Sequence, residues 1–258
     1  MKTLKLTATA VALLISAAPV LAQEAAPVLQ QGTAPVAAQE APAEETSFFT
    51  VTGGAAFVSD YRFRGTSLSN KEIAVQPYIT LNTAPGFFVG LWGSSIATYG
   101  GANTEVDVSG GWTGEVGPVT GTIGIVGYFY PGGTGVDYYE LYGTIAKTIG
   151  PVGLTLGINY SPGQANLIRD NFYVYGLGTF GIPNTPLTLK ASVGYEDGAG
   201  AIGVGAAGKS KVDYMVGADF KWKSLTFGVQ YIGNDVDKNN FNQFNTKDGF
   251  VFSITAGF

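Results

Sequence analysis

The 258-residue chain contains neither cysteine nor histidine. Without cysteine there is no disulfide framework, thiolate nucleophile, iron–sulfur cluster or zinc ribbon. Without histidine there is no Ser-His-Asp triad, no HExxH zinc site and no imidazole general base. We therefore predict that the protein is not an enzyme and that it has no catalytic residues, no metal site and no cofactor.

Charge is scarce as well. Charged residues make up 13% of the chain, about half the usual share for a soluble domain. The net charge of −5 argues against a nucleic-acid partner, which would require a basic patch. Mean hydropathy is mildly positive at +0.18, yet no apolar run beyond the N-terminus is long enough for a transmembrane helix. The apolar residues must therefore be dispersed along the chain.

The N-terminal residues predict two segments that precede the folded part. Lys2 and Lys5 come before a short apolar stretch over 6–18, and a small-residue cleavage pattern ends at Ala22. Residues 1–22 are thus expected to be a secretory signal peptide. Residues 23–47 are rich in Ala, Pro, Gln and Glu and contain no aromatic or basic residue. Such a segment buries too little apolar surface to order itself, so we expect a disordered tail.

From Phe48 to Phe258 the apolar residues alternate with polar or small ones, which indicates strands with one apolar and one wet face. One segment, over 87–97, is apolar on both faces, which suggests a bulge among its glycines. The pattern predicts twelve strands, over 48–65, 72–82, 87–97, 104–116, 120–130, 137–149, 153–161, 171–181, 187–195, 212–221, 225–231 and 248–258.

The connections between these strands alternate between tight turns and longer loops. Aromatic residues gather near both ends of the strands, as in the girdles at membrane interfaces. We predict an all-β fold: a transmembrane antiparallel up-and-down β-barrel over 48–258 in the outer membrane of a Gram-negative bacterium, with its N-terminus in the periplasm. The terminal aromatic Phe258 is expected to be the signal read by the outer-membrane assembly machinery. The other expected partners are outer-membrane lipids, lipopolysaccharide and small solutes.

Several motifs resemble the TorF-type porin family of proteobacteria. Taken in order, they are Ser59–Gly65, Trp92–Ser94, Glu105–Val108 with Gly110-Gly111, Tyr128–Gly132, Tyr139-Glu140, Tyr160–Pro162, Val193–Tyr195 and Asp213-Tyr214. The resemblance covers about 48–258 and implies an outer-membrane β-barrel with a pore role, without naming a substrate.

The alternation also assigns side chains to the lumen. If Phe57, Tyr61 and Phe63 of the first strand face lipid, its charged residues face inward, where they avoid the cost of facing lipid, about 2–4 kcal/mol each at mid-bilayer. Glu72, which begins the second strand, is expected close to Arg64. The predicted pore-lining residues are Asp60, Arg62, Arg64, Glu72, Glu105, Asp107, Glu115, Glu140, Tyr142, Tyr173, Tyr175, Lys190, Asp213, Asp219 and Lys221.

Two interpretations of this lumen stay open. The charges either form ion pairs that fill a narrow barrel, or form a constriction that selects solutes. The inward tyrosines either fill space or form a stacking track for sugars or aromatic solutes. The favoured function is a channel for passive diffusion of ions or small hydrophilic solutes, with a weak cation preference from the surplus of acids. The alternative is a closed structural or envelope-interaction barrel without transport.

Overall fold

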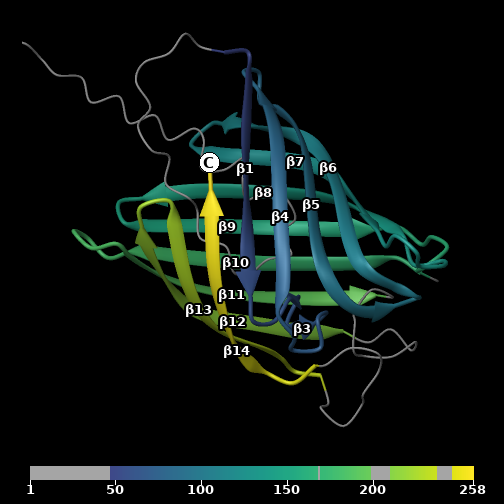
Figure 1. Ribbon diagram of the computed structural model, residues 1–258. Coiled ribbons are helices and arrows are strands. Elements are labelled where there is room, and N and C mark those ends of the chain that lie inside the picture. The colour runs from purple at the N-terminus through teal and green to yellow at the C-terminus, as the bar shows by residue number, and fades with distance from the viewer. Residues whose placement is uncertain (1–46, 168, 199–209, 237–245) are drawn as a thin grey trace, which may run out of the picture.

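The computed structural model describes residues 47–167, 169–198, 210–236 and 246–258, and these form a closed antiparallel β-barrel. The twelve wall strands follow chain order, and the first closes against the last (Figure 1). They are β1 (Phe49–Val58), β4 (Ala74–Thr83), β5 (Phe87–Tyr99), β6 (Ala102–Val116), β7 (Val119–Phe129), β8 (Tyr138–Ile149), β9 (Val152–Ser161), β10 (Asn171–Gly181), β11 (Leu187–Gly198), β12 (Lys211–Trp222), β13 (Leu225–Asn234) and β14 (Gly249–Gly257). The predicted barrel is confirmed, while the predicted signal peptide and almost all of the predicted tail lie outside the described residues.

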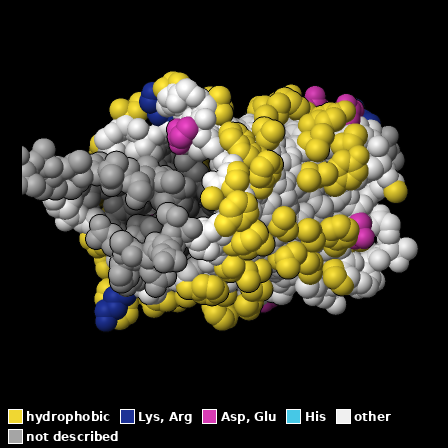
Figure 2. Space-filling view, turned by 90° about the horizontal axis from the view of Figure 1, so that it is seen from above, with side chains coloured by type: hydrophobic (Ala, Val, Ile, Leu, Met, Phe, Trp, Pro, Cys, Tyr) yellow, Lys and Arg dark blue, Asp and Glu magenta, His cyan; other side chains and the backbone are white. Residues whose placement is uncertain are grey.

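The alternation in the sequence separates the two faces of the wall. In β14, Phe250, Phe252 and Ile254 point outward and are exposed, whereas Val251 and Ser253 point inward and are buried. Figure 2 shows hydrophobic side chains spread over the visible outer face, with the charged ones mostly at its margins. Side chains exposed in this way can be buried only by a surrounding apolar medium.

No helix in the described ranges is long and apolar enough to cross a membrane.

Strand β5 contains the segment over 87–97 that is apolar on both faces, and it shows which of these side chains point inward. Phe88, Trp92 and Ile96 point inward and are buried, and Val89 and Leu91 point outward and are exposed. Its pairing with β6 is regular up to Ser95 and shifts only between Ser95 and Tyr99. The irregularity therefore lies beyond the strand glycines where a bulge was suggested.

The first predicted strand, over 48–65, is wrong beyond Val58. β1 ends there, and the segment Ser59–Ile73, here called the inward loop, turns into the barrel and carries the small strands β2 (Arg62–Phe63) and β3 (Thr66–Ser67). Tyr61 and Phe63 were expected to face lipid, but they are only 1% and 2% exposed. An inward hairpin satisfies the same alternation as a longer wall strand, so the period alone could not separate the two.

The seam between β1 and β14 is tightly packed. The backbone N–H and C=O of Phe258 both bond to Gly53, which completes the ladder at the short-turn end. At Gly54 an added Cβ would lie 2.2 Å from the carbonyl oxygen of Ala256 and 2.8 Å from the hydroxyl of Tyr78. The backbone of β14 cannot move out of so close a contact without a loss of stability, so this position requires glycine.

We expect Gly54→Ala to lower the temperature at which the barrel unfolds, because the methyl group would push β1 away from β14 at a cost of about 1–3 kcal/mol. Gly143→Ala is the matched control, since a Cβ there would lie 3.6 Å from its nearest neighbour. The heat-modifiable gel mobility of both variants measures this difference. Equal unfolding temperatures would contradict the tight seam.

Candidate functional site

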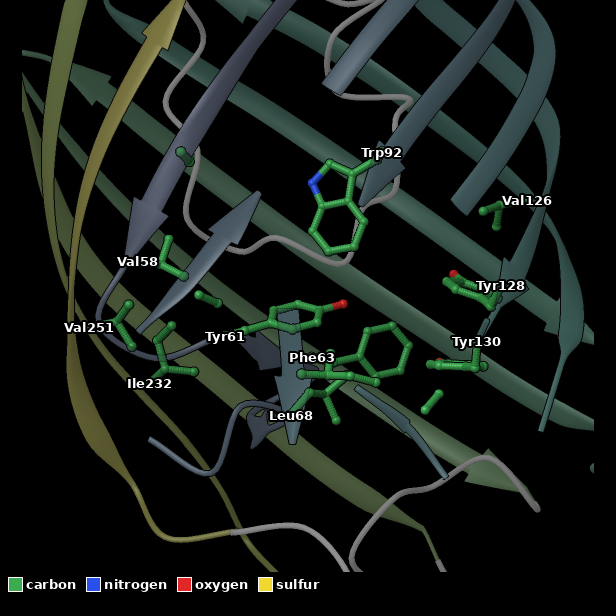
Figure 3. Close-up of a cluster of buried hydrophobic side chains, with 14 of the residues drawn as sticks. Val58, Tyr61, Phe63, Leu68, Trp92, Val126, Tyr128, Tyr130, Ile232 and Val251 are labelled. Atoms are coloured by element: carbon green, nitrogen blue, oxygen red, sulfur yellow. The ribbon is translucent and has the colours of Figure 1, made fainter. Parts of the chain in front are cut away.

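The inward loop fills the long-loop half of the lumen. Its backbone is tied to the wall where Ser59 donates to the carbonyl of Phe252 on β14 and the carbonyl of Leu68 accepts from Ala97 on β5. Figure 3 shows Tyr61, Phe63 and Leu68 inside the barrel, between wall residues such as Trp92, Tyr128, Ile232 and Val251. A chain segment thus occupies space that would otherwise be lumen.

The tip of this hairpin is a two-residue turn of Arg64 and Gly65. Both residues have positive φ, 46° and 80°, as a type I′ turn requires. Glycine adopts this conformation without strain, whereas arginine does so rarely. A Cβ at Gly65 would also lie 2.6 Å from the carbonyl oxygen of Gly233 on β13. The turn therefore fits closely against the wall and presents Arg64 to the lumen.

Arg64 contacts two strands of the wall, β8 and β11, which are separated by β9 and β10. Its Nη2 lies 2.6 Å from Oε2 of Glu140 on β8, and its Nη1 lies 2.5 Å from Oε1 of Glu196 on β11. Glu196 also pairs with Lys211 on β12 at 3.0 Å. All four side chains are at most 3% exposed. The guanidinium packs over the ring of Tyr173, with its carbon 4.3 Å from the ring centroid. This network fastens the loop across the lumen.

A second set of bonds holds the hairpin itself. Arg62 pairs with Asp60 at 2.6 Å and donates to the carbonyl oxygens of Gly65 and Lys247. Asp60 also accepts from the hydroxyl groups of Ser67 and Ser69. These buried charges therefore have their partners within the loop and in the segment just before β14.

The short-turn half of the lumen has a different lining. One buried ion pair, Lys190 with Asp219 at 2.7 Å, lies there. Much of the rest of this inward wall is hydroxyl-bearing, including Thr80, Ser109, Thr122, Thr226 and Thr255. The lumen thus has a charged, aromatic half beside the inward loop and a small-polar half beyond it.

The inward tyrosines lie flat against the wall. A Cβ on Gly157 would meet the ring of Tyr175 at 2.1 Å, and one on Gly194 would meet the hydroxyl of Tyr173 at 2.2 Å. These rings therefore cover the glycine backbone of neighbouring strands. This placement supports the space-filling interpretation over a track of rings that stand out into the lumen.

The structure places most, but not all, predicted site residues in the lumen. Glu72 is exposed before β4 rather than beside Arg64, whose guanidinium is paired elsewhere. Glu115 is exposed at the short-turn end of β6, and Lys221 is half-buried at the short-turn end of β12. The buried residues are Asp60, Arg62, Arg64, Glu105, Asp107, Glu140, Tyr142, Tyr173, Tyr175, Lys190, Asp213 and Asp219.

Two members of the central network were missed. Glu196 and Lys211 lie just beyond the predicted strands. The strand over 187–195 ends three residues before β11 does, and the strand over 212–221 begins one residue after β12 does. Glu196 continues the inward set of Lys190, Ser192 and Gly194, so extending the alternation by one residue would have found it.

Acids outnumber bases among the buried charges of the described residues. The seven acidic and four basic side chains are Asp60, Glu105, Asp107, Glu140, Glu196, Asp213 and Asp219, with Arg62, Arg64, Lys190 and Lys211. The bases all pair with other members of this set. The surplus leaves Glu105 and Asp107 of β6 and Asp213 of β12 outside the ion pairs above, although Asp213 accepts a hydrogen bond from Tyr173.

The sequence profile of a family described as "Bacterial protein of unknown function (Gcw_chp)" matches residues 42–258. That description names no TorF-type porin, so the resemblance to that family stays a prediction. No curated protein matches the chain.

Solved porins share the fold. The NanC porin superposes with a TM-score of 0.56 at 11% identity, over 81% of this chain and 99% of that one. The KdgM porin gives 0.55 at 10% identity, over 80% and 98%. The KdgM porin in complex with disordered oligogalacturonate gives 0.52 at 9% identity, over 81% and 97%. At such identities the likeness shows the fold alone.

We expect Arg64→Met to destabilise the barrel by about 3–5 kcal/mol, because Glu140 would lose its cation and Glu196 would lose one of two. Arg169→Met is the matched control. Its pair with Asp197 is exposed and 3.9 Å long, so the loss there should stay below about 1 kcal/mol. Urea unfolding in detergent micelles compares the two variants. Similar losses would contradict the structural role of Arg64.

Proposed function

We propose a function from the chemistry of the barrel, since this chain belongs to the Gcw_chp family of bacterial proteins of unknown function. The proposed function is an outer-membrane channel for passive diffusion of ions or small hydrophilic solutes. The channel has a weak preference for cations. The observation that carries this proposal is a porin-type barrel whose outer face is apolar and whose interior is polar and acidic. The fold favours a channel over an enzyme.

The size of the barrel supports a narrow path. Eight-stranded barrels are filled by side chains, and barrels of sixteen or more strands enclose wide aqueous channels. Twelve strands lie between these limits. The inward loop narrows one half further, whereas the other half is lined largely by small hydroxyl-bearing side chains. We therefore place the constriction at Arg64, and solutes must be small to pass it.

The proposed cation preference comes from the surplus of buried carboxylates. A ring of acids at a constriction attracts cations and repels anions. The KdgM porin was solved in complex with oligogalacturonate, a polyanion. An acidic lumen disfavours such a solute, so we do not carry this ligand over to the present chain.

The buried inward loop favours a second candidate, a closed barrel that serves the envelope by its structure alone. Every residue of the loop from Asp60 to Ser69 is buried, and Arg64 ties it to β8 and β11 of the wall. Conductance separates this candidate from the channel.

The proposed location follows from the same barrel. Outer-membrane barrels have short periplasmic turns and long outer loops, which would put both ends of the barrel chain in the periplasm and the inward loop on the outer side. Phe258 is 82% exposed and backbone-paired to Gly53. We propose that it contacts membrane lipid and, before insertion, the assembly machinery.

In a planar bilayer with a salt gradient, we expect the wild-type protein to give discrete current steps with a reversal potential on the cation-selective side. Replacing residues 60–71 by a short Gly/Ser turn should raise the step conductance several-fold, because it removes the segment that fills the long-loop half. Heat-modifiable gel mobility shows that each protein is folded. An anion-selective reversal potential would contradict the charge assignment, and silence of both folded proteins would favour the closed barrel.

A further inference from the structure

We propose that Asp107 and Glu105 of β6, with the rings of Trp92 on β5 and Tyr128 on β7, bind the positively charged head of an organic ammonium compound inside the lumen. This inference rests on the channel proposed above, since it names the class of solute that the constriction would take. Nothing in the likeness to other barrels assigns such a site.

The register of three strand pairs brings these groups into one row. Trp92 is the direct partner of Asp107, and Asp107 is the direct partner of Tyr128. Tyr128 is in turn opposite Tyr138 on β8, and the two rings stack with centroids 4.4 Å apart. Directly opposed side chains on one face of an antiparallel pair have Cβ atoms about 4.5–5.5 Å apart. The Asp107 carboxylate is therefore flanked by aromatic rings on both sides.

The loop side of this row is aromatic and acidic too. The ring of Tyr61 lies 5.4 Å from that of Trp92, and its hydroxyl is 3.4 Å from Oε1 of Glu105. Glu105 is two residues before Asp107 on the same face of β6, so its carboxylate adds a second negative charge beside the first. Figure 3 shows Tyr61 with its hydroxyl directed toward the side of the barrel that carries Trp92 and Tyr128.

The acids of this row lack a counter-charge. Both carboxylate oxygens of Asp107 and Oε2 of Glu105 have no hydrogen-bond partner among the residues that the structure describes, although each side chain belongs to a residue only 1% exposed. A buried carboxylate without a partner carries a large desolvation cost. The four buried basic side chains of the described wall and loop pair with other acids. A cation supplied from outside would remove this cost.

The lining selects among cations. Trp and Tyr rings attract a cation to their faces, and recognition of substituted ammonium groups uses such rings beside an acid. A calcium ion needs six or more oxygen ligands, and no group of three or more metal-ligating side chains occurs within the described ranges. The carboxylates of Asp107 and Glu105 lie between the rings of Tyr61, Trp92 and Tyr128. This arrangement fits a singly charged ammonium head with a short apolar tail better than a divalent metal.

Trp92 makes the site observable. The chain has three tryptophans, and the other two, Trp112 and Trp222, lie near the short-turn ends of β6 and β12. In a Trp112→Phe/Trp222→Phe background of the full-length protein, propylammonium chloride is titrated while Trp92 emission is followed. 1-Propanol at equal concentration is the uncharged control. We expect a saturable change with propylammonium and none with propanol.

Two substitutions test the assignment to Asp107. Asp107→Asn keeps the shape and removes the charge, and we expect it to weaken propylammonium binding at least about tenfold. Glu115→Gln is the matched control, because it removes the same charge from the exposed far end of the same strand, and its affinity should equal that of the parent. Heat-modifiable mobility verifies that both are folded. If Asp107→Asn does not fold, Glu105→Gln replaces it, with a weaker loss expected.

The absence of a saturable response in the parent, an equal response to propanol, or unchanged affinity in folded Asp107→Asn would overturn the proposal. The optical titration needs no current, so the two proposals fail separately. Current steps without saturable binding overturn the ammonium site and leave the channel. Saturable binding that Asp107→Asn abolishes, in a protein that is silent in bilayers, supports the site and overturns the channel.

Discussion

A membrane-spanning wall must satisfy its own backbone, and the closed hydrogen-bond ladder from β1 to β14 does so without leaving an edge. Because successive side chains of a strand point to opposite faces, closure of the sheet turns every second residue of each strand into the lumen. With apolar residues outward, the charged and hydroxyl-bearing residues of the chain are brought together in one confined space. The properties of the lumen follow from that constraint.

Within the lumen, the charges have to find partners, and Arg64 supplies the central one. It contacts Glu140 and Glu196 from a hairpin tip that itself depends on the positive φ of Gly65. The loop is therefore fixed by the barrel, and two buried acids of the barrel, Glu140 and Glu196, are in turn paired with a cation of the loop. A fold in which the wall strand β1 had simply continued would leave the interior wider and Arg64 without its present position between Glu140 and Glu196.

The part of the lumen that this arrangement leaves uncompensated is the row around Asp107. Its acids face aromatic rings rather than basic side chains. Elsewhere in the interior, Tyr173 and Tyr175 cover glycines of neighbouring strands. The buried bases there are paired with acids, and Asp213 accepts a hydrogen bond from Tyr173. The acids of this row lack basic partners, whereas the acids around Arg64 have them. This difference is the basis for proposing a class of solute for this barrel.

The sequence by itself determined the barrel, because alternation with a period of two, tight Pro/Gly turns and dispersed apolar residues are local properties of the chain. It located eleven of the wall strands to within three residues at each end and identified the inward face of β6, β8 and β11. Only the tertiary structure decided the fate of Ser59–Ile73, since Arg62 and Arg64 keep the same parity on a longer strand and on an inward hairpin. The partners of Arg64 were likewise beyond the sequence, because Arg64 reaches Glu140 on β8 and Glu196 on β11 only from a hairpin that folds into the barrel.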